Sequence, residues 1–276
     1  MTLPFSQGLL LVTAISYCAA FVLHALSFTG VFAKGHRPAF FLMRLGFFLG
    51  TFYFGADAIE HGSFVPVANL SQALAFFAWS IAFVYLVLLA QVQSESFGLV
   101  LTPILSVLVL AACLFFNLKS KPISVPLNPA FSVHIVSAFF AYACFSLSFA
   151  ASILYLIQHR ELKHHHAGNF YHRLPSLEAL EKLISQPILW GVPLLLAAIG
   201  IGFVWSKSVF GEFWFWDVKT LATFFVAALY FLILYLHSMS SVRGRRVALM
   251  SVFAFALVLF CFVGTRFISG SHHFLQ

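Results

Sequence analysis

Long runs of apolar residues dominate this chain, and they restrict it to one kind of fold. A helix that crosses a membrane needs about 20 consecutive, mostly apolar residues, and eight segments of the sequence meet that requirement. These segments span residues 7–32, 39–58, 71–91, 97–116, 131–157, 187–205, 217–239 and 247–268. We therefore expect an all-α protein, a polytopic bundle of about eight transmembrane helices, with residues 1–276 forming a single integral membrane domain.

The low charge content supports the same conclusion. Of the 276 residues, 62% are hydrophobic and only 8% are charged, whereas a soluble domain carries about 25% charged residues. So few charges cannot cover a water-facing surface, which excludes soluble and secreted disulfide-linked folds. The net charge of +7 is better explained by basic loops at the membrane surface than by nucleic-acid binding. We expect the lipid bilayer, and no nucleic acid, among the partners.

The basic residues also predict how the chain crosses the membrane. If there are eight spans, the loops on one side hold nine Lys and Arg residues and the loops on the other side hold five. Basic residues collect in cytoplasmic loops, so we expect the more basic side to face the cytoplasm. Both termini then face outward. This pattern predicts a multi-pass protein of the bacterial inner, or plasma, membrane.

The longest polar segment, residues 158–186, lies on the predicted cytoplasmic side. Within it, apolar residues recur at helical spacing, which is typical of an amphipathic helix at the membrane surface. These residues are Leu177, Leu180, Leu183 and Ile184. The three consecutive histidines at residues 164–166 are interpreted as a solvated loop, with metal contact as the alternative.

Histidines and aromatic residues converge on the opposite, outer side. His134 lies near the start of the fifth span, and His272 and His273 follow the eighth. Between them in the sequence, the loop at residues 206–217 carries a dense aromatic cluster that ends in an acidic residue. Its members are Phe210, Phe213, Trp214, Phe215, Trp216 and Asp217. Ionisable residues at or inside a membrane are costly and often functional, so this face is the candidate site.

This set of side chains suits haem, which is flat and apolar and has two axial iron positions. Imidazole is a common axial ligand, aromatic rings pack on the macrocycle, and Lys219 follows the loop closely enough to pair with a propionate. The alternative is an aromatic belt without a ligand, because Trp and Tyr collect at membrane surfaces in any case. His24 and His237 form a weaker pair at the inner depth of the membrane, interpreted either as a second haem site or as two unrelated buried histidines.

The loop and its flanking histidines resemble the cytochrome c assembly family of haem-handling membrane proteins, which carries a tryptophan-rich "WWD" loop. The family loop reads approximately W-G-x-[FYW]-W-x-W-D-x-[KR], and this chain matches it at Gly211, Phe213, Trp214, Trp216, Asp217 and Lys219. The family's outer histidines match His134 and His273, with His272 as a one-residue alternative. Its intramembrane histidine matches His237. The chain departs from the pattern at three places. Phe210 replaces the first Trp, and Gly50 replaces a histidine often found in the second span. The Pro-Lys-Glu-Thr that often follows the Asp is Val-Lys-Thr-Leu here, at residues 218–221.

The resemblance implies a transiently bound haem b at the outer face, with His134 and His273 as axial ligands to its iron and the aromatic loop as its platform. It also implies that haem is presented to the thiols of apocytochrome c. The chain is then at most the haem-presenting subunit of a cytochrome c haem lyase, with no catalytic residue of its own. A membrane partner with a large periplasmic domain is expected.

Two alternatives remain open at this point. The family also has short members associated with tetrapyrrole synthesis, and the length of this chain fits them as well. One alternative is therefore a regulatory membrane protein of haem biosynthesis. The other is a membrane transporter or scaffold that binds no haem.

Overall fold

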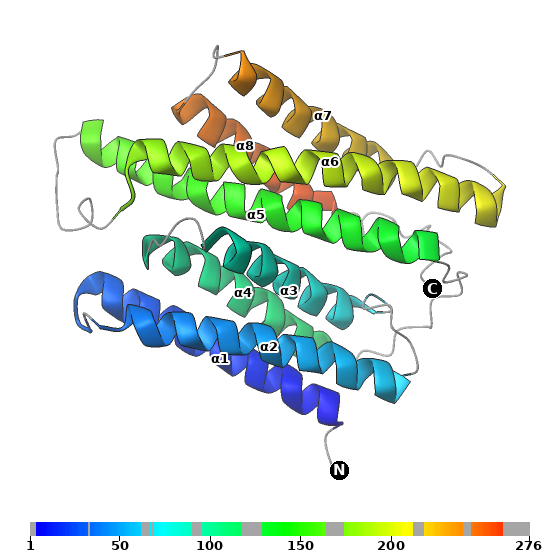
Figure 1. Ribbon diagram of the computed structural model, residues 1–276, viewed down its shortest axis with the longest axis horizontal. Helices are drawn as coiled ribbons and strands as arrows, with labels where there is room; N and C mark the ends of the chain where they lie inside the picture. The colour runs from blue at the N-terminus through cyan, green and yellow to red at the C-terminus, as the bar shows by residue number, and fades with distance from the viewer. Residues whose placement is uncertain are drawn as a thin grey trace. The chain divides into compact units, whose positions relative to one another are not determined.

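The part of the chain that the structure describes is helical throughout. The computed structural model describes residues 4–32, 34–61, 67, 69–89, 95–116, 129–163, 174–211, 218–239 and 244–261. Within these ranges there are eight helices and no strand (Figure 1). Seven of the eight are long and apolar enough to cross a membrane, and the last described helix has 15 residues. The predicted class, a polytopic helical membrane protein, is confirmed.

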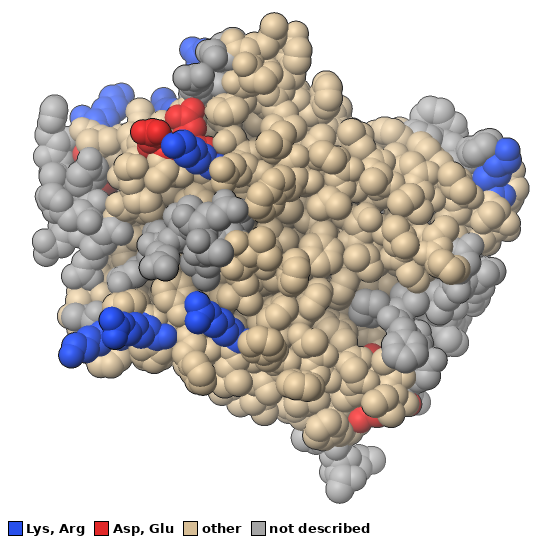
Figure 2. All heavy atoms as spheres, in the orientation of Figure 1, with Lys and Arg blue, Asp and Glu red and all other residues tan. Residues whose placement is uncertain are grey.

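The outer surface is that of a lipid-facing protein. On the face drawn in Figure 2, charged side chains are sparse and uncharged surface is broad. Large apolar side chains point outward: Phe52 is 66% exposed and Phe253 is 59% exposed. In water such exposure would favour aggregation, whereas in a bilayer it places apolar groups against lipid.

The first four helices form one compact unit. They are α1 (Phe5–Thr29), α2 (His36–His61), α3 (Leu70–Leu89) and α4 (Glu95–Phe115). α1 packs against α2 and α4, and α3 packs against α4. Gly46 of α2 allows one close approach, because a Cβ at this position would lie 2.6 Å from the Tyr17 ring of α1. Small residues at helix interfaces are the usual means of close packing in lipid.

Two acidic residues near the C-terminal end of α2 are bonded inside this unit. The buried Asp57 carboxylate accepts a hydrogen bond from the Gln72 amide of α3. The Glu60 carboxylate accepts from the backbone N–H and the hydroxyl of Ser6 at the start of α1. An unpaired charge at the buried Asp57 would be strongly unfavourable. The contacts of Asp57 and Glu60 tie α3 and α1 to one end of α2.

The last four helices form a second compact unit. They are α5 (Pro129–Lys163), α6 (Leu177–Phe210), α7 (Val218–Ser238) and α8 (Arg245–Leu259). α6 runs along α5, α8 packs on α5, and α7 contacts α6 and α8. The hydroxyl oxygens of Ser148 on α5 and Ser251 on α8 are 2.8 Å apart, which places a buried hydrogen bond between these helices.

α5 and α6 extend beyond the predicted spans, most clearly at the start of α6. The predicted amphipathic segment is helical and forms the first part of α6, whose 34 residues are continuous; its position at the membrane surface stays a prediction. At 1.5 Å per residue this helix is about 51 Å long, well beyond a hydrocarbon core of about 30 Å. Leu180, Leu183 and Ile184 are at most 2% exposed. Packing within the protein therefore explains the apolar face.

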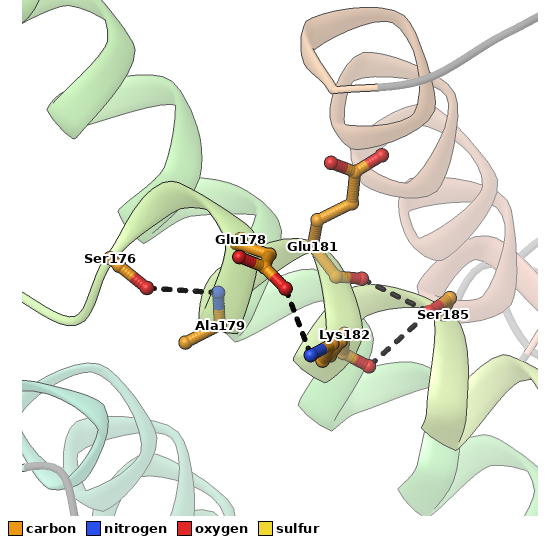
Figure 3. A network of polar contacts seen from close by, with 6 residues as sticks. All are labelled: Ser176, Glu178, Ala179, Glu181, Lys182 and Ser185. Carbon is orange, nitrogen blue, oxygen red and sulfur yellow. Dashed lines mark hydrogen bonds and ion pairs between the residues drawn. The ribbon is translucent and has the colours of Figure 1, made fainter.

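Polar contacts at the start of α6 explain why it begins so early (Figure 3). The Ser176 hydroxyl caps the helix by accepting from the Ala179 N–H at 3.2 Å. Glu178 and Lys182 form an ion pair one turn apart, at 3.0 Å. The Glu181 carboxylate accepts from the Gly244 N–H at the start of α8, at 3.1 Å. These contacts stabilise the part of α6 that precedes the predicted span.

The division into two units does not test the predicted single membrane domain, which stays a prediction.

Candidate functional site

One predicted iron ligand, His134, lies in the second turn of α5 and is held by α6. The distance between His134 Nδ1 and the carbonyl oxygen of Ala198 is 2.7 Å. A carbonyl oxygen can only accept, so Nδ1 carries the hydrogen. In the neutral ring the lone pair then resides on Nε2. Metal-binding histidines commonly use this arrangement, in which a backbone carbonyl fixes one nitrogen and the other faces the metal.

Gly202, one turn after Ala198 on α6, provides the space for this contact. A Cβ at Gly202 would lie 2.8 Å from His134 Nδ1 and 2.9 Å from its Cε1. Gly200 on the same helix has no neighbour within 4 Å of such a Cβ. The imidazole therefore needs only one of these two glycines.

Aromatic rings gather at the same end of this unit. Phe131, one turn before His134, packs on Trp205 of α6 with ring centroids 4.8 Å apart. Trp205 meets the Phe210 ring edge-on at 5.6 Å. Its indole N–H is buried and has no hydrogen-bond partner among the residues that the structure describes. A buried donor without an acceptor is destabilising, so a ligand acceptor at this position would be favoured.

Four of these residues are additions to the predicted site: Phe131, Ala198, Gly202 and Trp205. Phe131 and His134 are three residues apart, as are Gly202 and Trp205, so each pair shares one helix face. That spacing alone does not single out Gly202 and Trp205 in the sequence, because their roles depend on rings of α5. Ala198 acts through its backbone, which leaves no signal in the sequence.

Most of the other predicted residues lie outside the described part of the chain. They are Phe213, Trp214, Trp216, Asp217, His272 and His273. Lys219 lies in the first turn of α7, and its side chain is not described. α6 continues to Phe210, so the loop predicted to start at residue 206 begins later, at Gly211, whose φ is 78°. Joint iron ligation by His134 and His273 stays a prediction.

His237 lies at the opposite end of the same unit. Phe224 near the start of α7 stacks on Phe203 of α6 at 5.9 Å, whereas His237 near the end of α7 lines a groove with Ser185 of α6. Ser185 and Gly202 are 17 residues apart on α6, which is about 25 Å. His134 and His237 therefore lie toward opposite ends of this unit, and their placement at the outer and inner depths of a membrane stays a prediction. The groove has a volume of about 460 Å³, and within the described ranges His237 Nδ1 is buried without a hydrogen-bond partner.

His24 belongs to the first unit. It is 2% exposed, and its ring lies over Gly98 of α4, where a Cβ would be 2.5 Å from Nε2. The Phe40 ring of α2 meets it edge-on at 5.1 Å. Neither ring nitrogen has a hydrogen-bond partner among the described residues. Because His24 and His237 are in different units, the structure does not test a haem site shared between them.

The surroundings of His134 suit a metal that is already bound in a macrocycle. Among the described residues, no three His, Cys, Asp or Glu side chains lie close enough to hold a bare metal ion. A single imidazole beside aromatic rings is suited to an axial position, because a porphyrin supplies the equatorial nitrogens itself. The unpartnered Trp205 N–H adds a donor for a carboxylate such as a propionate.

Comparisons with known proteins point to one group of membrane proteins. The family described as "Cytochrome C assembly protein" matches residues 67–273. Protein HemX of Brevibacillus brevis is 33% identical over 257 residues, which cover 91% of this chain and 93% of that protein. Cytochrome c biogenesis protein CcsA of Porphyra purpurea is 26% identical, covering 76% of this chain and 78% of that protein.

A solved structure shares the fold. Cytochrome c Heme Lyase CcmF matches with a TM-score of 0.69 and 15% sequence identity. The match covers 98% of this chain and 50% of the CcmF chain, so this chain spans half the length of that protein.

Proposed function

Because the chain belongs to the cytochrome c assembly protein family, we propose that it is a haem-handling membrane protein of c-type cytochrome biogenesis. It presents haem at the outer face of the membrane for attachment to apocytochrome c. The observation that carries this function is the state of His134, whose Nδ1–H is bonded to the Ala198 carbonyl. This bond favours the neutral tautomer with its lone pair on Nε2, on the same helix face as Phe131, whose ring packs on Trp205.

The two outer histidines, His134 and His273, would hold the iron of a bound haem. Together they would exclude competing ligands from the metal. Haem, when bound, supplies the vinyl groups to which cysteine thiols are attached. The protein contributes position rather than a reacting group, since bringing the partners together in a fixed orientation is itself a large rate effect.

The aromatic loop is the platform for the macrocycle. Phe213, Trp214 and Trp216 cover its faces and keep water from the iron. Lys219 pairs with a propionate. Asp217 directly precedes the first residue of α7 in the sequence, a position from which an aspartate side chain could cap the helix.

His237 would hold a transiently bound haem b at an earlier position, at the inner depth. The groove of about 460 Å³ beside His237 supports this assignment. The protein lies in the bacterial inner membrane with both termini outside. A membrane partner with a large periplasmic domain completes the lyase.

The absorbance spectrum of the purified protein tests this function. We expect a Soret band in the wild type that is weakened by His134→Ala or His273→Ala and lost in the double variant. His159→Ala, at the far end of α5, is the matched control and should keep the band. In a deletion strain, covalent cytochrome c should be lost while total haem is unchanged. A wild-type protein without a Soret band, or a deletion strain with normal cytochrome c, would contradict the proposal.

Regulation of haem biosynthesis is the second candidate function. Sequence identity supports it: HemX of Brevibacillus brevis is 33% identical to this chain, whereas CcsA of Porphyra purpurea is 26% identical. For a regulator, the deletion strain should show altered total haem with cytochrome c still covalently loaded. The two measurements therefore separate the candidates.

A further inference from the structure

α6 contacts His134 at two adjacent points, and we infer that Gly202 and the Ala198 carbonyl are the positioning elements that make this histidine a ligand. Gly202 provides the space in which the ring lies, and the carbonyl selects the tautomer with its lone pair on Nε2. The inference rests on the proposed function, because it explains how the outer haem ligand is prepared before haem arrives.

The hydrogen bond determines the tautomer. Its length, 2.7 Å between Nδ1 and the Ala198 oxygen, leaves no room for an intervening water. Ala198 is 1% exposed, so solvent does not compete for its backbone. A carbonyl oxygen has two lone pairs and can accept from His134 in addition to its own helix. The opposite neutral tautomer would place two lone pairs against each other across this short distance.

Gly202 determines the position of the ring. Glycine is a poor helix former, so its place inside α6 calls for a reason. A methyl group here would come within 2.8 Å of Nδ1 and 2.9 Å of Cε1, closer than carbon and nitrogen atoms normally pack. The ring would have to move away from α6, and the bond to the Ala198 carbonyl would break.

Loss of this support should weaken iron binding without removing the ligand. A hydrogen bond from Nδ1–H to a carbonyl raises the basicity of Nε2, and removing such a partner typically lowers metal affinity by about 10- to 100-fold. Gly202→Ala is therefore expected to lower haem affinity within this range. It should also shift the midpoint potential of the bound haem, because the axial ligand sets that potential.

The test compares Gly202→Ala with Gly200→Ala in the full-length protein. Gly200 lies two residues away on α6 and has open space around it, so its variant controls for the change in helix propensity. Haem titration and redox potentiometry measure ligation. A readout independent of haem is the tautomer of His134 in the haem-free protein, obtained by nitrogen-15 NMR of labelled histidine and assigned with His134→Ala.

We expect the wild type and Gly200→Ala to show the Nδ1–H tautomer, and Gly202→Ala to lose both the tautomer and haem affinity. The inference is overturned if Gly202→Ala keeps the wild-type tautomer and affinity. It is also overturned if the wild type carries the hydrogen on Nε2, a result that needs no variant to fold. If the wild type binds no haem, the proposed function fails, and the NMR result still decides whether Gly202 sets the tautomer.

Discussion

Replacing Trp205 with Phe separates two effects that act in opposite directions. Phenylalanine preserves an aromatic ring against Phe131 and Phe210 but removes the indole N–H. That N–H is buried and has no partner among the described residues. Burying a donor without an acceptor costs about 1–3 kcal/mol. In the haem-free protein, Trp205→Phe should therefore be neutral or stabilising.

Haem binding should respond in the opposite way. If the indole N–H donates to a propionate, the variant loses a hydrogen bond to a charged acceptor, which is worth about 1.5–3 kcal/mol. Because about 1.4 kcal/mol corresponds to a factor of ten in affinity, haem affinity should fall roughly 10- to 150-fold. The two effects have opposite signs, so a general loss of structure would not reproduce them.

The assay pairs a Soret titration with unfolding of the haem-free protein in detergent. Trp190→Phe is the control, because Trp190 lies 15 residues earlier on α6 and is 38% exposed. It should change neither haem affinity nor the free energy of unfolding appreciably. If Trp205→Phe is destabilised and binds haem as well as the wild type, the indole N–H is bonded within the protein and the reasoning is refuted.

Three further predictions follow from the packing. His237→Ala should leave the Soret band of the outer site intact but lower the yield of covalent cytochrome c, measured by haem staining; an unchanged yield would argue against an inner haem position. Gly46→Ala should cost about 1–3 kcal/mol in unfolding experiments by overpacking against the α1 ring. At Gly55 an added Cβ would have no neighbour within 4 Å, so Gly55→Ala should stabilise the protein by up to about 1 kcal/mol. Equal changes in the free energy of unfolding for Gly46→Ala and Gly55→Ala would disprove the difference in packing. Ser148→Ala and Ser251→Ala should couple by about 0.6 kcal/mol in a double-mutant cycle, and additive effects would show that their hydrogen bond contributes nothing.

The fold class was predictable because apolar runs of membrane length leave few other solutions. Helix ends were less predictable. Glu178 and Lys182 interrupt the apolar pattern and suggest a boundary, yet α6 continues through them because they pair with each other and the opposite face packs inside the protein. Polarity thus marks where a helix leaves the lipid, not where it ends.

The site was predictable to the extent that residue types revealed it. His134 stood out as an ionisable residue at the membrane surface. Trp205 lies before the aromatic loop and reads as ordinary span composition, and only its packing on Phe131 places it at the site. Gly202 is equally inconspicuous in the sequence, because its role depends on a ring that belongs to another helix.

The acceptor for His134 is a main-chain oxygen, and this affects how the protein tolerates genetic change. A small replacement such as Ala198→Ser alters the side chain and leaves that oxygen in place. Such a variant would not reveal the hydrogen bond to His134. Position 202 behaves in the opposite way, because every side chain larger than hydrogen enters the volume of the imidazole. Two neighbouring positions that serve one histidine should thus differ sharply in mutational tolerance.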